Sequence, residues 1–340
     1  KNNVAVGHDS LSSNTTADSN TAVGKSALEA NTTGANNTAV GSSALASNTT
    51  ANANIAIGVD ALNDNTTGAL NVAVGTYALD TNTTAERNTA IGYAAMDANT
   101  EGQYNTAVGA NALDANTTAS YNTTVGYRSL GANTTGSENT AIGADAGLSI
   151  TTGSYNVAMG YRALDTNTTG DYNVALGRRA LDSNTTASNN VAIGRSSMES
   201  NTTGTNNVAV GSTSLDANTE GDQNVAIGRD VLSANTTGQD NVGVGYASLQ
   251  AATTASNNTG LGSKALRSST TGAQNTAIGA ECGDAITTGS NNTAVGYEAM
   301  GKLTTGTDNV AIGRAALLDT LSGAGNVAIG VESLENNTGN

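Results

Sequence analysis

Acidic side chains recur in this chain at multiples of 17 residues. The series is Asp80, Asp97, Asp114, Asp165, Asp182, Glu199 and Asp216. Two carboxylates held at a fixed distance could cleave a glycosidic bond. Such catalysis, however, needs one cleft in which the two groups have unlike environments. A row of equivalent acids is instead typical of a solvated surface that prevents lateral aggregation. We therefore predict that the chain is not an enzyme and has no catalytic residue.

Other reactive residues are too few to build a site. His8 is the only histidine and Cys282 the only cysteine, which excludes an internal disulfide and a cysteine-based metal cluster. A lone histidine offers neither a metal site nor a pairing of base and nucleophile. Phosphate-binding loops, nucleophile elbows and calcium-binding glycine–aspartate repeats are also absent from the sequence. We predict no metal and no cofactor.

The elements that carry these residues follow a strict repeat. Twenty asparagines stand 17 residues apart, from Asn3 and Asn20 to Asn326, without an insertion or a deletion. Each unit approximates N-[VT]-A-[VI]-G-x-x-[AS]-[LM]-x-x-N-T-T-G-x-x, which we number as positions 1 to 17. A short uninterrupted period is the signature of a solenoid, in which each turn contacts only its neighbours. The sequence predicts one continuous repeat domain over residues 1–340.

Each unit is expected to form one coil. Positions 1 to 5, as in NVAVG or NTAIG, favour a strand, because they alternate β-branched and small residues. Glycine then occupies position 5 of every unit, as at Gly7, Gly24, Gly177 and Gly330, and allows a sharp turn. We predict a second strand at positions 8 to 10 and another turn at N-T-T-G. The expected fold is all-β: a parallel β-solenoid or β-roll of about twenty coils, about 95 Å long.

Two aliphatic positions are candidates for the core. Position 4 is always aliphatic or methionine, and position 9 is Leu or Met in eighteen units. The predicted core residues are Val6, Leu28, Ile57, Leu79, Ile91, Leu164 and Leu181. Gly147 and Gly283 replace the leucine of position 9, and in the same units position 12 becomes Ile150 and Ile286. We predict that positions 9 and 12 share one interior space.

The strand itself is apolar on both faces. Positions 2 and 4 face one side and position 3 the other, and neither side is reliably polar. Such strands are normally buried on both faces, whereas a lone solenoid covers only its inside. We therefore expect self-association, and which face forms the interface is left open.

Charge and composition exclude several partners. The formal net charge is −15, which disfavours nucleic acid and anionic lipid. No run approaches the length of a membrane span, so this segment is not expected to insert into a membrane. The first residues lack a secretion signal, and we expect a removed leader or a longer parent chain.

Asparagine, threonine and tyrosine rows are candidates for surface function. The N-T-T stretches match the glycosylation sequon, but coils about 4.8 Å apart favour a hydrogen-bonded asparagine ladder instead. Threonine rows at position 13 make ice binding an alternative function. Tyrosines at position 17 are candidate binding residues for a protein or a glycan, although simple surface decoration explains them too. They are Tyr104, Tyr121, Tyr155 and Tyr172.

The segments NTAVG, NVAIG and NVAVG, with Ala or Ser three residues after the glycine, resemble a known motif. They are similar to the head repeats of trimeric autotransporter adhesins, the YadA-like head, and to repeats of phage tail fibres and bacterial surface proteins. The resemblance covers essentially the whole chain. It implies a left-handed parallel β-roll, three chains side by side, exposed outside the cell or on a virion, and adhesion as the activity.

We therefore expect a structural and adhesive extracellular fibre, a homotrimer that attaches through many weak contacts to a receptor, matrix or glycan on a host or neighbouring cell. The alternatives are a surface filament whose subunits polymerise end to end and an ice-binding β-solenoid.

Overall fold

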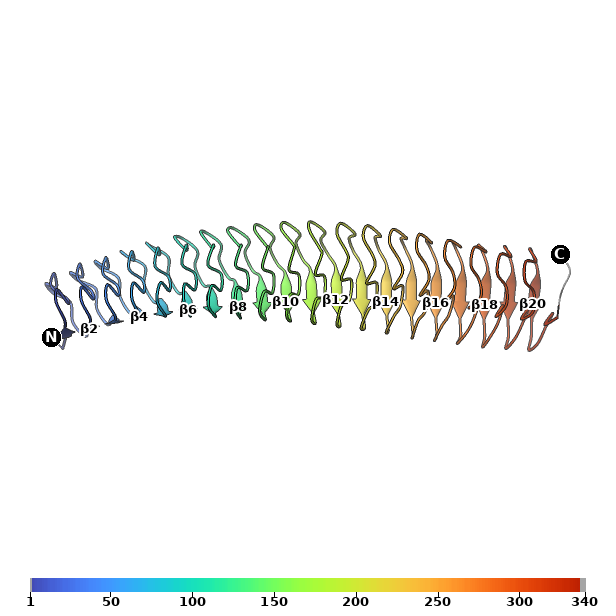
Figure 1. The fold of residues 1–340 in the computed structure, drawn as a ribbon, viewed down its shortest axis with the longest axis horizontal. Helices are drawn as coiled ribbons and strands as arrows, with labels where there is room; N and C mark the ends of the chain where they lie inside the picture. Colours follow the sequence, from blue (N-terminus) through green and yellow to red (C-terminus); the bar gives the residue numbers. More distant parts are fainter. Residues whose placement is uncertain (1, 337–340) are drawn as a thin grey trace. The chain divides into compact units, whose positions relative to one another are not determined.

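The computed structural model describes residues 2–336 and is all-β, with no helix in that range. The chain divides into two compact units, Lys1–Asp171 and Tyr172–Asn340, and each contains ten short strands. In Figure 1 the strands of the first unit run from blue to green and those of the second from green to red. The strands of the first unit are β1 Val4–Val6, β2 Thr21–Val23, β3 Thr38–Val40, β4 Ile55–Ile57, β5 Val72–Val74, β6 Thr89–Ile91, β7 Thr106–Val108, β8 Thr123–Val125, β9 Thr140–Ile142 and β10 Val157–Met159. Those of the second unit are β11 Val174–Leu176, β12 Val191–Ile193, β13 Val208–Val210, β14 Val225–Ile227, β15 Val242–Val244, β16 Thr259–Leu261, β17 Thr276–Ile278, β18 Thr293–Val295, β19 Val310–Ile312 and β20 Val327–Ile329.

Within each unit, consecutive strands pair in parallel and in register. Ala5 lies opposite Ala22 between β1 and β2, and Ala192 lies opposite Ala209 between β12 and β13. Equivalent repeat positions therefore stack on one another, one strand per coil (Figure 1). The predicted parallel β-solenoid with one 17-residue repeat per coil is confirmed.

The second strand predicted at positions 8 to 10 is wrong. In the second repeat these positions, Ala27 to Glu29, form a turn, and the backbone is left-handed at Ser26 and Leu28, with φ of 55° and 51°. Left-handed residues on alternate positions interrupt the extended conformation. The Leu28 N–H still donates to the Ala44 carbonyl of the next coil at 3.0 Å, so the coils remain hydrogen-bonded at this turn.

The predicted core is half correct. Leu28, Leu79, Leu164 and Leu181 at position 9 are fully buried. The position 4 residues point outward instead: the exposed fractions of Val6, Ile57 and Ile91 are 58%, 41% and 40%. Because successive side chains of a strand alternate between its faces, position 3 points inward when position 4 points outward. The interior is thin: the alanine of position 3 lines it on the strand side, and the leucine of position 9 fills the remaining space.

The shared interior space of positions 9 and 12 is confirmed. A Cβ added to Gly147 would lie 3.0 Å from the Cδ1 of Ile150, and a Cβ added to Gly283 would lie 3.0 Å from the Cδ1 of Ile286. The larger residue at position 12 thus occupies the space that leucine fills elsewhere.

The turn glycines at position 5 are required by conformation, and Gly7, Gly24 and Gly177 are required by space as well. Gly7, Gly24, Gly177 and Gly330 have φ of 137°, 138°, 136° and 124°, a region that L-residues rarely adopt. A Cβ on Gly24 would also collide with the carbonyl of Gly41 in the next coil.

Buried asparagines complete the interior. The side chain of Asn71, at position 1, donates to the Ala85 carbonyl of its own coil at 2.8 Å and accepts the N–H of Asn88 from the next coil at 2.9 Å. Asn82, at position 12, donates to the same Ala85 carbonyl at 3.1 Å and to Oδ1 of Asn65 at 2.8 Å. The predicted asparagine ladder is present, in two rows, and it satisfies polar groups that the thin core would otherwise leave unpaired.

Candidate functional site

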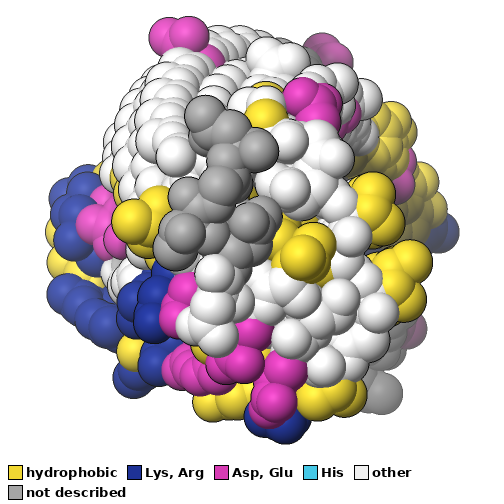
Figure 2. All heavy atoms as spheres, turned by 90° about the vertical axis from the view of Figure 1, so that its right-hand side faces the viewer, with side chains coloured by type: hydrophobic (Ala, Val, Ile, Leu, Met, Phe, Trp, Pro, Cys, Tyr) yellow, Lys and Arg dark blue, Asp and Glu magenta, His cyan; other side chains and the backbone are white. Residues whose placement is uncertain are grey.

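The outward strand face is the most extensive candidate surface in each unit. We call the side chains at positions 2 and 4 of successive strands the outward stripe. Members of the stripe in the first unit include Ile57, Ile91 and Ile142, and members in the second include Ile193 and Ile227, all exposed. Hydrophobic side chains are also visible at the surface in the end view of Figure 2. Ten coils about 4.8 Å apart, with a stripe about 10 Å wide, make a face of roughly 500 Å² per unit, with an aliphatic side chain or methionine at position 4 of every strand and valine, isoleucine or threonine at position 2.

An area of this size needs an explanation. The largest apolar patch on a typical monomer is about 300–600 Å², and patches at the upper end commonly mark interaction sites. The stripe differs from a chance patch because an aliphatic side chain or methionine recurs at position 4 of every strand. The sequence contained one signal of which strand face points inward. Position 3 is always Ala, Gly or Thr, as expected for the side that faces a thin interior.

The tyrosines predicted as binding residues are all exposed, and two of them, Tyr104 and Tyr121, stack on each other. The rings of Tyr104 and Tyr121 are stacked, with centroids 5.1 Å apart and planes 5° apart. Tyr155 lies in the same unit two coils after Tyr121, and Tyr172 begins the second unit. The pair is extended on one side by Arg87, whose guanidinium lies 5.3 Å from the centre of the Tyr104 ring.

Several carboxyl groups of the acidic row at position 10 have raised pKa values. Burial, and then the carboxylates of Asp97, Asp64 and Asp60, raise the pKa of Asp80 to about 6. Burial and the next carboxylate, Asp114, also raise the pKa of Asp97. Neighbouring acids are therefore shifted in the same direction, which differs from the opposed shifts of a catalytic acid and base.

The expectation of a solvated stripe is wrong for two of these acids. In the first unit Asp165 is 6% exposed and pairs with Arg162 at 2.7 Å. In the second unit Asp182 is 3% exposed and pairs with Arg179 at 3.0 Å, while the same arginine reaches Glu199 at 2.7 Å. The arginine at position 7 covers the acid at position 10 of its own coil, which removes the carboxylate from water.

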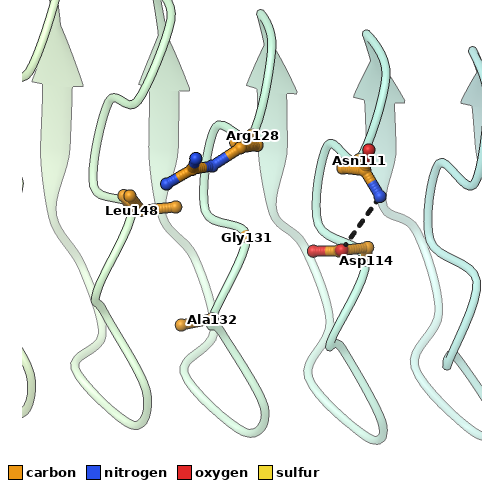
Figure 3. A pocket seen from close by; sticks show the side chains of 6 residues that line it. All are labelled: Asn111, Asp114, Arg128, Gly131, Ala132 and Leu148. Atoms are coloured by element: carbon orange, nitrogen blue, oxygen red, sulfur yellow. Dashed lines mark hydrogen bonds between the residues drawn. The ribbon is translucent and has the colours of Figure 1, made fainter.

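Two hollows interrupt the acidic row where position 10 is glycine. One, of about 310 Å³, is lined by Asn111, Asp114, Arg128, Gly131, Ala132 and Leu148 (Figure 3). The other, of about 190 Å³, is lined by Glu281, Asp284, Glu298, Gly301, Lys302 and Leu318. In the first, Asn111 donates to Asp114 at 3.2 Å, and Arg128 extends from the neighbouring coil (Figure 3). Neither hollow combines a nucleophile with a base, so we assign no chemistry to them.

The remaining reactive groups are also accounted for. Cys282 is buried, and burial raises the pKa of its thiol to about 12, which makes it unreactive at neutral pH. His8 lies on the surface, 2.7 Å from the carboxylate of Asp9. Within residues 2–336 no group of three or more His, Cys, Asp or Glu side chains could hold a metal ion, and no helix could span a membrane.

The sequon asparagines after Asn14 are inaccessible, whereas Asn14 is half-buried. Asn31, Asn48 and Asn65 are fully buried, and each donates its side-chain amide to the carbonyl of position 15 in its own coil. The position 13 threonines are also engaged: the Thr32 hydroxyl donates to the Thr49 carbonyl at 3.0 Å. A glycan on the folded coil would have to displace the ladder.

No protein-family model matches the chain, and no curated protein matches it significantly.

Proposed function

We propose that this chain is a non-enzymatic structural and adhesive fibre segment that works outside the cell, at a cell surface or on a virion. One observation carries the proposal: an exposed aliphatic stripe runs along every strand ladder while the interior is already filled. A solenoid that needed only to fold would place polar residues on its outer face. The stripe supports self-association, for which we propose a homotrimer in line with the resemblance of the repeats to adhesin heads.

The adhesive part of the proposal follows from repetition. Near-identical coils present the same side chains at a fixed spacing, so that a weak contact with a receptor, matrix or glycan is multiplied along each unit. The negative net charge supports neither nucleic acid nor anionic membranes as the target.

Sedimentation or light scattering of the purified chain tests the self-association. We expect a trimer, and we expect Ile193→Glu with Ile227→Glu to shift it to a folded monomer because both charges would lie in the outward stripe. Thr67→Glu is the control, since Thr67 is exposed outside the stripe. A wild-type monomer at micromolar concentration would refute self-association through this face, and long filaments would favour end-to-end polymerisation.

Adhesion is tested separately with beads coated at increasing density. Attachment to cells or to matrix should rise more steeply than the coating density, as multivalent binding requires. If attachment equals that of beads coated with an unrelated acidic protein at all densities, the adhesive role is wrong.

A specific observation keeps ice binding as a second candidate. The outward position 2 is threonine on four consecutive strands, at Thr89, Thr106, Thr123 and Thr140. This row lies on a regular strand face, unlike the position 13 threonines, whose hydroxyls bond to the backbone. Thermal hysteresis measures the activity directly, and a null result at millimolar concentration would eliminate this candidate.

A further inference from the structure

The hollow in the first unit lies where one coil has no side chain at position 10. Position 10 is an acid at Asp114 and Asp165, but it is glycine at Gly131. A Cβ added to Gly131 would lie 3.3 Å from Oδ1 of Asp114 and 3.2 Å from Cδ1 of Leu148. The hollow of about 310 Å³ above this glycine therefore includes the place that a carboxylate side chain occupies in other coils.

In other coils the side chain at position 7 donates to the position 10 carboxylate of its own coil. Asn111 donates to Asp114 at 3.2 Å. In the second unit Arg179 pairs with Asp182 at 3.0 Å and also reaches Glu199 of the next coil at 2.7 Å. One arginine of this chain thus holds an acid of its own coil and an acid of the next coil at the same time.

Arg128, at position 7 of the glycine coil, has only half of that arrangement. Its Nε lies 3.4 Å from Oδ1 of Asp145 on the next coil, and its own coil has Gly131 in place of an acid. Its guanidinium also lies 5.6 Å from the ring centre of Tyr127, and in Figure 3 the side chain extends toward the coil of Leu148. A guanidinium has five N–H donors, so Arg128 can keep Asp145 and bind a second carboxylate.

The rest of the lining favours an anion with an apolar part over a cation. The carboxylate of Asp114 already receives hydrogen bonds from the Asn111 side chain and from the backbone N–H groups of Asp114 and Ala115. A cation would also meet Arg128, which lines the same hollow, while Ala132 and Leu148 supply apolar surface. The lining therefore fits a carboxylate on a short apolar stem.

The neighbouring acid does not exclude a carboxylate from this place. Position 10 carries Asp80, Asp97 and Asp114 on three consecutive coils, about 4.8 Å apart. None of these coils has a cation at position 7, where the residues are Tyr77, Ala94 and Asn111. A ligand carboxylate on the next coil would repeat the same spacing with Arg128 added, so its electrostatic environment is more favourable than one the chain already contains.

We infer that the hollow above Gly131 is a binding site for a carboxylate group on a short apolar stem, held by Arg128 and packed against Leu148. An aspartate or glutamate side chain of a protein partner and a free small carboxylic acid share this chemistry. No covalent bond forms or breaks at the site, because the ligand only takes the place of a position 10 acid. The site lies outside the outward stripe, and the inference does not rest on the proposed function.

The hollow in the second unit is a natural comparison. Position 7 of its glycine coil is Glu298, which would repel a carboxylate. The lysine of its lining, Lys302, is held by Asp319 at 2.6 Å. We therefore expect no carboxylate binding there, although the position 10 residues follow the same order of acid, glycine and leucine, at Asp284, Gly301 and Leu318.

NMR on the full chain tests the inference, with propionate as the probe and the ionic strength held constant with chloride. We expect the Leu148 methyl groups and the Nε–H of Arg128 to shift together, with half-saturation at about 10–50 mM. Ethylammonium, of opposite charge and similar size, should leave both signals unchanged. A short peptide with one glutamate and its glutamine analogue distinguish the sources. If the glutamate peptide binds at least as tightly as propionate, the ligand is a partner's side chain; if only propionate binds, it is a free acid.

Two variants remove the site in different ways. Arg128→Ala removes the cation, and Gly131→Asp places a carboxylate of the chain in the hollow, so each should weaken propionate binding at least about 5-fold. Both fit the local backbone, because position 7 is alanine at Ala94 with φ of 48° and Gly131 is not left-handed. Gly301→Asp is the matched control, since it adds the same charge in the other hollow and should leave binding unchanged.

Four results would each overturn the site. They are unshifted signals up to about 200 mM propionate, ethylammonium binding equal to or tighter than that of propionate, full binding in Arg128→Ala, and an equal loss in Gly301→Asp. Neither the oligomeric state nor attachment to cells enters these readouts, so this site and the proposed function can fail separately.

Discussion

Two asparagines of one coil donate to the same carbonyl, yet we expect them to differ in their contribution to stability. Asn71→Ala removes the 2.8 Å bond to the Ala85 carbonyl and the acceptor of the Asn88 N–H, at 2.9 Å. The Ala85 carbonyl keeps Asn82 as its donor at 3.1 Å, whereas the Asn88 N–H is left buried without an acceptor. An orphaned buried donor costs about 1–3 kcal/mol and a lost hydrogen bond about 1 kcal/mol, which gives about 2–4 kcal/mol for the variant.

Asn82→Ala in the same coil is the matched comparison. The Ala85 carbonyl then keeps Asn71, and Asn99 keeps the Gly102 carbonyl at 3.0 Å. The Asn99 amide loses Oδ1 of Asn82 as its second acceptor, and the side-chain oxygen of Asn65 loses its donor, a state that Asn133 and Asn235 already tolerate. We therefore expect a cost of about 1 kcal/mol.

Amide hydrogen exchange is the suitable assay, because a solenoid can open locally and a single unfolding free energy need not exist. The Asn88 amide should exchange about 30- to 1000-fold faster in Asn71→Ala, and about 5-fold faster in Asn82→Ala. Thr67→Ala, at an exposed site, sets the baseline. Equal acceleration in the two asparagine variants would refute the assignment of the main cost to the orphaned backbone group.

Three further predictions concern other parts of the coil. Leu79→Ala should cost about 2–5 kcal/mol of local stability by hydrogen exchange, whereas Ile91→Ala should leave the coil intact and weaken only self-association in sedimentation. Cys282 should resist thiol-specific alkylation at pH 8 in the folded chain and react on denaturation, because burial raises its pKa to about 12; rapid labelling of the native chain would contradict this. The raised pKa of Asp80, about 6 against 3.8, means that the folded state binds the proton more tightly, so stability should increase as the pH falls from 7 to 4, by no more than about 1 kcal/mol after solvent screening. Denaturant midpoints across this pH range measure the effect, and Asp80→Asn should remove its share.

The fold was predictable because the 17-residue period of the sequence equals the length of one coil. Position 1 is always asparagine, position 5 always glycine, and position 9 is Leu or Met in eighteen units. Each stacks on its equivalent in the next coil, so the spacing between Asn20 and Asn37 is the coil length. The compensating pair Gly147 and Ile150 places position 9 in the interior from residue volumes alone, and the structure agrees. Both inferences use volume and periodicity, which a sequence expresses well.

Which face of the strand points into the interior was not predictable in the same way. Both faces of Ile55–Ile57 are apolar, so the alternation rule that assigns an inside does not apply. The turn at positions 7 to 9 was also missed, because a leucine such as Leu28 with φ of 51° contradicts its own backbone preference. Hydrogen bonds to the next coil offset that strain, and such bonds leave no trace in residue type.

The tyrosine row was predictable as a row, and its geometry was not. A 17-residue spacing places Tyr104 and Tyr121 on adjacent coils, but whether the rings stack depends on the common left-handed backbone at position 17. The contact of Arg87 with the Tyr104 ring became visible only with that backbone in place.

The two asparagine rows also explain why position 1 is never substituted while position 12 varies. At position 12 asparagine is replaced by Ile150, Ala252, Ser269, Ile286, Leu303 and Thr320. A position 12 amide bonds mainly to another side chain and shares its carbonyl with position 1, so its removal leaves no backbone group orphaned. A position 1 oxygen accepts a buried backbone N–H of the next coil, as Asn54 does from Asn71, and nothing else in the coil reaches that donor. An insertion between positions 1 and 15 would displace this asparagine from both of its partners at once, at a cost of about 1–3 kcal/mol for each orphaned group. The constant length of the repeat is therefore a consequence of hydrogen bonding between coils rather than of the small apolar core.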